Sequence, residues 1–210
     1  MKIAVVAAAG KAGRKIVAEA ASRGFEVTAF VRKATEIDGA TKVIVKDILA
    51  LTTDDLKDFD AVVDAFGAWT PETLPLHTTT SQHLCDALSG TNVRLLIVGG
   101  AGSLYTDKTH TTQISEKANL PAEWKPIIDA AADALNELRK RNDVKWTYVS
   151  PALDFQADGA RTGKYILAGE EFTLNAAGES IVSYADYALA MVDEIANGNH
   201  IQQRISVVRA

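Results

Sequence analysis

Short apolar runs rich in β-branched residues alternate along this chain with segments whose apolar residues recur at helical spacing. Six runs predict strands at 3–7, 26–31, 42–45, 61–65, 95–98 and 146–149, and a seventh, at 205–208, predicts a last strand at the sheet edge. Most of these runs are apolar at nearly every position, which is typical of parallel strands covered on both faces. The alternation therefore predicts a doubly wound, mostly parallel α/β sheet with right-handed crossovers.

Two long segments interrupt this alternation. Residues 99–125 show little periodicity, and residues 151–180 form a small C-terminal elaboration with strand-like pieces at 165–167 and 172–174. Both follow the carboxyl end of a predicted strand, where open α/β sheets bind ligands. Long loops in a compact domain are usually functional. With 210 residues and neither repeats nor a linker, we predict one domain over 1–210.

Composition excludes several classes of function. The net charge is −5 with mixed signs, which argues against a nucleic-acid surface. No apolar run approaches the roughly 20 residues of a membrane span. The single cysteine, Cys85, fits a reducing compartment, so we expect a cytoplasmic protein. The four histidines are scattered without ligand spacing, and no metal site is predicted.

The first predicted strand runs directly into a glycine-containing turn and then a helix. Residues 7–14 read Ala-Ala-Ala-Gly-Lys-Ala-Gly-Arg, with Ala7 standing where the usual dinucleotide fingerprint has a glycine. Such a turn directs backbone N–H groups and a helix N-terminus toward one point, which favours an anion. Gly10 would let a diphosphate approach the backbone, and Gly13 would let helix and strand pack closely. The predicted cofactor-binding residues here are Ala9, Gly10, Lys11, Ala12, Gly13 and Arg14.

The ends of the next three strands supply further candidates. Arg32 and Lys33 stand where NAD-preferring sites place an acidic residue, so we expect NADP(H) to be favoured over NAD(H) through its 2′-phosphate. Asp47, followed by Ile48, could accept a hydrogen bond from the adenine amino group or could serve only the turn. The small-residue turn that would pass near the cofactor comprises Phe66, Gly67 and Ala68.

These pieces together resemble the atypical short-chain dehydrogenase/reductases. The resemblance is to their NAD(P)H-binding branch, which includes biliverdin-IXβ/flavin reductases, bacterial proteins labelled NADH-flavin reductases, and NmrA-like redox sensors. The segments that carry it are 7–13, 31–32, 47–48, 66–67, 98–103, 146–151 and 181–188. The resemblance implies a Rossmann-type fold, with Gly99 and Gly100 bordering the nicotinamide ribose. It also implies that Pro151, Ala152 and Leu153 line the nicotinamide amide, and that Ser103 lies near the superfamily's catalytic serine.

One departure from that superfamily bears on the chemistry. Its proton donor is a tyrosine with a lysine four residues later, and no tyrosine of this chain is followed by a lysine at that spacing. Alcohol–ketone chemistry through such an acid is therefore not expected. Hydride transfer to a flavin, a quinone or a similar conjugated acceptor remains open, because the cofactor carries the reaction and solvent can supply a proton. The candidate catalytic residues are Ser103 and Tyr105.

The sequence thus predicts an NAD(P)H-dependent reductase with a small planar acceptor as its substrate. A non-catalytic NAD(P)-binding redox sensor is the alternative. A sugar-nucleotide epimerase or dehydratase is disfavoured by the missing acid and the short C-terminal portion. Trp69 and Trp124 could either wall a planar pocket or pack long loops. Monomer and homodimer are both open.

Overall fold

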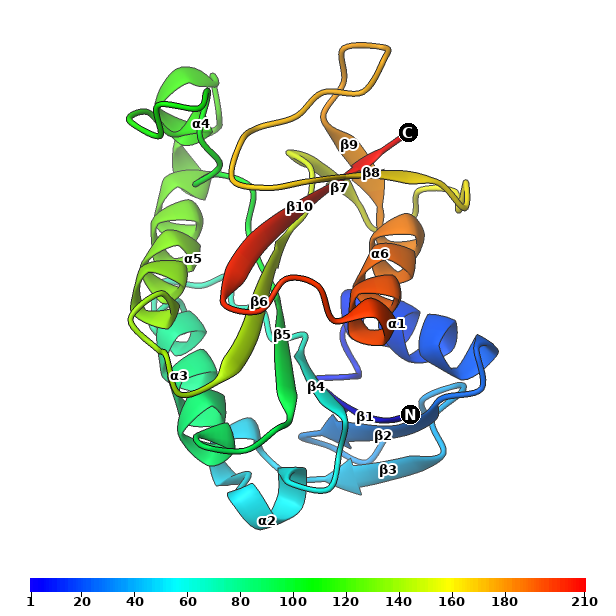
Figure 1. Ribbon diagram of the computed structural model, residues 1–210. Coiled ribbons are helices and arrows are strands. Elements are labelled where there is room, and N and C mark those ends of the chain that lie inside the picture. The colour runs from blue at the N-terminus through cyan, green and yellow to red at the C-terminus, as the bar shows by residue number, and fades with distance from the viewer.

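The computed structural model describes residues 1–210 and confirms a mostly parallel, doubly wound sheet (Figure 1). Its eight strands follow the order β3-β2-β1-β4-β5-β6-β10-β8, and every neighbouring pair is parallel except β10 with β8. The strand order reverses between β1 and β4, which defines the switch point where doubly wound sheets bind ligands. The strands are β1 (Lys2–Val6), β2 (Glu26–Val31), β3 (Lys42–Val45), β4 (Ala61–Asp64), β5 (Arg94–Val98), β6 (Lys145–Ser150), β8 (Tyr165–Ala168) and β10 (Gln203–Arg209).

Helices cover both faces of the sheet (Figure 1). On one face α1 (Lys11–Ser22) packs beside α6 (Tyr184–Asn197), and on the other α3 (Leu76–Leu88) packs beside α5 (Lys125–Leu138). Ile16, Val17 and Ala20, which form an apolar stripe at helical spacing along α1, are fully buried in the core. The connections hold four short helices, η1 (Ile48–Ala50), α2 (Thr53–Leu56), α4 (Ile114–Lys117) and η2 (Ala122–Trp124). No helix combines the length and hydropathy that a membrane span requires.

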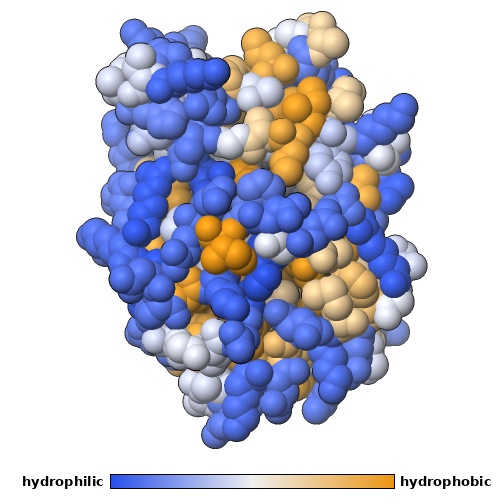
Figure 2. Space-filling model, in the orientation of Figure 1, coloured by the Kyte–Doolittle hydropathy of each residue, from blue (hydrophilic) through white to orange (hydrophobic).

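The C-terminal part of the sheet corrects two predictions. The last strand, β10, does not form the edge, because the antiparallel β8 pairs along its outer side. Hydrophobic side chains gather over this edge strand (Figure 2), where Leu167 is exposed. Residues 172–174 are not a strand; the amide of Phe172 instead donates to the carbonyl of Tyr105 at 2.7 Å. A separate two-stranded parallel sheet pairs β7 (Asp154–Gln156) with β9 (Ile181–Ser183).

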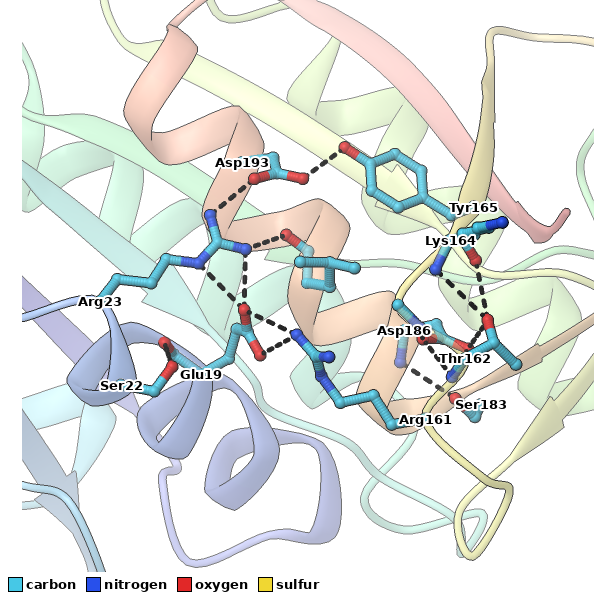
Figure 3. A network of polar contacts seen from close by, with 12 residues as sticks. Glu19, Ser22, Arg23, Arg161, Thr162, Lys164, Tyr165, Ser183, Asp186 and Asp193 are labelled. Carbon is cyan, nitrogen blue, oxygen red and sulfur yellow. Dashed lines mark hydrogen bonds and ion pairs between the residues drawn. The ribbon is translucent and has the colours of Figure 1, made fainter.

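A polar network joins α1, α6 and β8 (Figure 3). The guanidinium of Arg23, just beyond α1, donates to Glu19 Oε1 at 2.8 Å and to Asp193 Oδ1 at 2.6 Å. The hydroxyl of Tyr165, in β8, donates to Asp193 Oδ2 at 2.7 Å. Asp193 therefore links the helical layer to the edge strand.

A buried carboxylate fixes the segment that follows β7 (Figure 3). Asp186, in the first turn of α6, is fully buried and accepts from the amides of Thr162 and Gly163 at 3.0 and 2.9 Å. Its own amide donates to the hydroxyl of Ser183, which caps the N-terminus of this helix. The C-terminal elaboration is thereby held against the body of the fold.

Candidate functional site

A single large cleft of about 1130 Å³ opens at the carboxyl ends of the parallel strands. Its lining comes from the segments that follow β1, β2, β3, β4, β5 and β6, together with the start of α6 and parts of α3 and α5. Hydrophobic residues make up 24 of the 40 that line it. A largely apolar cleft at the switch point, with a few polar groups along it, is the usual setting of a cofactor site.

The turn after β1 leaves the N-terminus of α1 available to an anion. Gly10 is the N-cap residue, and no side chain caps this end of the helix. Its amide closes the turn by donating to the carbonyl of Ala7 at 3.1 Å. The amides of Lys11, Ala12 and Gly13 have no acceptor within the helix because they belong to its first turn. Ala9, Gly10, Lys11 and Ala12 line the cleft, as expected for a diphosphate site.

The two glycines of this turn have different roles. A Cβ at Gly13 would lie 2.8 Å from Ala8 Cα and 2.9 Å from the Ala7 carbonyl oxygen, so only glycine lets helix and strand approach this closely. A Cβ at Gly10 would meet only the Ala7 carbonyl oxygen, at 3.4 Å. Gly10 is therefore not required by the packing of the protein alone, and its missing side chain leaves space in the cleft.

Ala7 adopts the left-handed backbone conformation, with φ of +57°. An L-residue with a Cβ pays about 1–2 kcal/mol for this conformation, and glycine does not. Because glycine also loses more chain entropy on folding, we expect Ala7→Gly to raise the free energy of unfolding by about 0.5–1 kcal/mol. Urea denaturation would measure this gain, and a less stable variant would contradict the assigned strain.

Of the three arginine and lysine residues predicted to bind the cofactor in α1 and after β2 besides Lys11, two line the cleft and one does not. Arg32 and Lys33 are exposed, line the cleft and form no ion pair within the protein. Arg14 does not line the cleft. Its Nε donates to the carbonyl of Ala9 at 3.1 Å and its Nη1 to that of Glu36 at 3.1 Å. Arg14 therefore ties the first turn to the segment that follows β2, a scaffolding position.

Some of the candidates after β3 and β4 line the cleft and others do not. Asp47 caps η1 by accepting from the amide of Leu49 at 2.9 Å and does not line the cleft, whereas Ile48 does. After β4, Phe66 and Gly67 line the cleft, while Ala68 is buried beside the imidazole of His77. Asp64, at the end of β4, also lines the cleft and is not among the residues predicted from the sequence.

Asp64 is a buried carboxyl group on the floor of the cleft. It ends β4, pairs in register with Val6 at the end of β1, and accepts from the amide of Phe66 at 3.0 Å. It is 3% exposed. Burial disfavours the ionised form and raises the pKa of Asp64 from 3.8 to about 6.

This raised pKa makes stability depend on pH at Asp64. The folded state holds the proton to higher pH than the unfolded state, so this contribution to stability is complete below about pH 4 and is lost as the pH rises through 6. We expect Asp64→Asn, which can still accept from Phe66, to raise the free energy of unfolding at pH 7.5 by about 2–3 kcal/mol. Denaturation of both proteins at pH 3.5 and 7.5 tests this. An equal difference at the two pH values would contradict it.

Tyr148 positions the glycines that follow β5. A Cβ at Gly99 would lie 2.2 Å from the Tyr148 ring, so this position requires glycine. The amide of Gly100 donates to the Tyr148 hydroxyl at 3.0 Å, and the Ser150 hydroxyl donates to the carbonyl of Gly100 at 2.8 Å. Gly99 and Gly100 both line the cleft. Tyr148 and Ser150, two residues apart in β6, therefore fix the backbone at the carboxyl end of β5.

Ser103 lines the cleft and is held from behind by a buried arginine. Arg204, in β10, donates from Nη1 to Ser103 Oγ at 2.9 Å and from Nη2 to the Ser103 carbonyl at 3.0 Å. Its side chain is fully buried and pairs with Glu170 Oε2, which also accepts from Arg139. Because Ser103 Oγ accepts from Arg204, its own proton is free to be donated.

Tyr105 lies apart from the cleft. Its ring stacks on His110 with centroids 4.6 Å apart, and the guanidinium of Arg204 lies over it, 5.6 Å from the ring centroid. Its amide donates to the carbonyl of Glu170 at 2.9 Å. Tyr105 does not line the cleft, so we assign it a part in holding the loop and none in the chemistry proposed below.

The segment after β6 contributes alternately to the cleft and to the core. Pro151 and Leu153 line the cleft, whereas Ala152 is 1% exposed and packs in the core. Further along, Phe155 in β7 packs on Tyr184 at the start of α6, with ring centroids 4.0 Å apart, and both rings line the cleft. Neither aromatic residue was predicted, because no local pattern shows that these two segments meet.

The fold, the open turn and the apolar cleft define a dinucleotide-binding α/β protein of the Rossmann type. The sequence pattern of the family described as NAD(P)H-binding matches residues 7–198, and the chain belongs to this family. The Bacillus subtilis (strain 168) protein YwnB is 41% identical over 210 residues, which cover 99% of this chain and 98% of that relative.

Solved structures extend this comparison. A Streptococcus pneumoniae TIGR4 protein that is provisionally named an NADH-flavin reductase is 53% identical, with both chains fully covered and a TM-score of 0.97. A Bacteroides thetaiotaomicron protein that is provisionally named an epimerase is 33% identical, covers 99% of this chain and 96% of its own, and has a TM-score of 0.84. The NAD(P)H-binding fold is thus common to relatives with different provisional names.

Proposed function

We propose that this protein is an NADPH-dependent reductase that passes hydride to a conjugated planar acceptor such as a flavin or a quinone. The observation that carries the proposal is one continuous, largely apolar cleft that is lined both by the uncapped turn at the start of α1 and by the segment that carries Ser103. Such a cleft has room for a dinucleotide and for a second planar molecule beside it. The similarity to the Streptococcus pneumoniae protein supports the same class of reaction.

The residues of the cleft fit a nicotinamide dinucleotide. The first-turn amides of α1 and the side chain of Lys11 would hold the diphosphate, and Arg32 and Lys33 would hold a 2′-phosphate. Gly99, Gly100, Pro151 and Leu153 would border the nicotinamide end. When bound, the cofactor supplies a hydride to the acceptor.

Ser103 would assist the acceptor with its hydroxyl group. Arg204 occupies a lone pair of Ser103 Oγ, which leaves the serine proton as the donor toward the cleft. A hydroxyl held in this way can donate a hydrogen bond to a carbonyl or ring nitrogen that gains charge during reduction.

NADPH oxidation followed at 340 nm with riboflavin and a naphthoquinone as acceptors tests this function. We expect turnover with at least one of them, together with NADPH binding in a parallel calorimetric titration. Tight NADPH binding without turnover on either acceptor would contradict the reductase and favour a redox sensor.

The preference for NADPH depends on the two cations after β2. Each charged hydrogen bond to a 2′-phosphate is worth about 1.5–3 kcal/mol. Arg32→Asp should therefore weaken NADPH binding by about 10- to 150-fold while leaving NADH binding unchanged or tighter. Titration of both cofactors into both proteins measures this, with Lys42→Asp on the exposed start of β3 as a control. Unchanged affinities would refute the assignment of Arg32.

A further inference from the structure

The charged residues that line the cleft are not spread evenly along it. All four lining cations follow the first three strands of the sheet: Lys11, Arg32, Lys33 and Lys46. Lys46 is already paired with Asp55 at 2.6 Å. The only lining carboxyl group, Asp64, lies on the floor at the switch point, and His77 is neutral at pH 7 because burial lowers its pKa.

On the other side of the switch point, where β4, β5 and β6 end, no charged residue besides Asp64 lines the cleft. We call this part the acceptor half, and define it by Trp69, Leu120, Trp124, Ile127, Ile128, Phe155 and Tyr184. Arg204 lies behind Ser103 but is itself fully buried and neutralised by Glu170, so it offers no free charge to a ligand. A phosphate or sulfonate in the acceptor half would lose water without gaining a counter-ion.

Two tryptophans of the acceptor half are exposed to solvent. Trp69 is 70% exposed, with its ring over Gly67, and Trp124 is 48% exposed at the end of η2. Both line the cleft. Indole rings left in water beside an apolar cleft can gain contact area by stacking on a planar molecule. Because both rings line the acceptor half, such stacking would occur there.

We propose that the acceptor is an uncharged planar aromatic molecule held against Trp69 and Trp124, and that a phosphate-bearing acceptor is disfavoured. This inference rests on the proposed function and specifies its substrate class. The cationic half would be occupied by the dinucleotide, whose own negative charge adds to the chain's net charge of −5. An anionic acceptor would therefore meet repulsion with no neutralising group beside it.

Pairs of ligands that share a ring system, with one member of each pair carrying an added anionic group, provide the test. The NADP⁺-loaded protein is titrated with riboflavin and with FMN, and NADPH oxidation is measured with 1,2-naphthoquinone and its 4-sulfonate. We expect the uncharged member of each pair to be favoured at least tenfold, in dissociation constant and in kcat/KM. Equal or better use of FMN and the sulfonate would overturn the proposal and leave the reductase function standing.

Exposed tryptophans can be replaced without disturbing the core. Trp69→Ala and Trp124→Ala should each weaken riboflavin binding by about tenfold and leave NADP⁺ affinity unchanged, with Leu167→Ala on β8 as the control. Unchanged riboflavin affinity in both variants would overturn the assignment of the site. Riboflavin binding without any NADPH oxidation would contradict the proposed function alone, and absence of riboflavin binding to the NADP⁺-loaded protein would overturn the acceptor site.

Discussion

Gly10→Ala is expected to lower the affinity for NADPH by about 10- to 100-fold while leaving the fold intact. The backbone at Gly10 is extended and accessible to any residue, and the added methyl would touch only the Ala7 carbonyl oxygen within the protein. It would instead occupy the space where a diphosphate approaches the turn, and overpacking of this kind costs about 1–3 kcal/mol. Calorimetric titration measures the affinity. Thermal unfolding should show a stability loss below about 1 kcal/mol.

Gly13→Ala is the matched comparison within the same turn. Its methyl would lie within 3 Å of the Ala8 and Ala7 backbone, so the helix must move away from β1. We expect a loss of at least about 2 kcal/mol in the free energy of unfolding in addition to lost binding. A Gly10→Ala protein that is destabilised as strongly as Gly13→Ala, or that binds NADPH like the natural protein, would contradict the roles assigned here.

Arg204→Met is expected to cause the largest loss of stability of any single substitution considered, about 3–5 kcal/mol. The change leaves the carbonyl groups of Ser103 and Glu170 without their buried donor and removes one of two cations from Glu170. The loop that carries Ser103 would lose its anchor, so NADPH oxidation should fall as well. Urea denaturation and the 340 nm assay measure the two effects.

Arg139→Met is the control for that substitution. Arg139 pairs with the same Glu170 oxygen at 2.8 Å, but its side chain is 33% exposed. Ion pairs at such positions contribute about 0–1 kcal/mol, so stability and activity should change little. Similar losses in the two variants would show that Glu170 pairing in general, and not the buried Arg204, holds the loop.

Much of the fold could be predicted because its determinants are local. The wholly apolar runs fix the parallel strands, and the stripe of α1 fixes which face of that helix is buried. The edge could not be predicted in the same way. Pairing of β8 outside β10 depends on contacts between segments about 40 residues apart, and no periodicity in 151–180 encodes them.

The same distinction between local and distant determinants applies to the residues of the site. The turn at Gly10 and the cations after β2 line the cleft as the sequence predicts, because adjacent residues encode them; their contact with a cofactor stays a prediction. Arg204 was missed because a lone arginine at the start of an apolar strand looks like a surface residue until Ser103 and Glu170 are seen to surround it. Asp64 lies within a predicted strand, so the sequence does not mark it as a site residue. Of the two roles that the sequence leaves open for Asp47, the structure shows the turn role, because Asp47 caps η1. The role of such a side chain depends on its burial and on partners from distant elements, which the sequence alone does not show.

A crystal structure of the protein with NADPH tests the central claim most directly. The account predicts diphosphate oxygens at about 2.7–3.2 Å from the amide nitrogens of Lys11 and Ala12, with the 2′-phosphate beside Arg32. A bound dinucleotide whose diphosphate lies elsewhere, or a turn that stays empty at saturating NADPH, would contradict it.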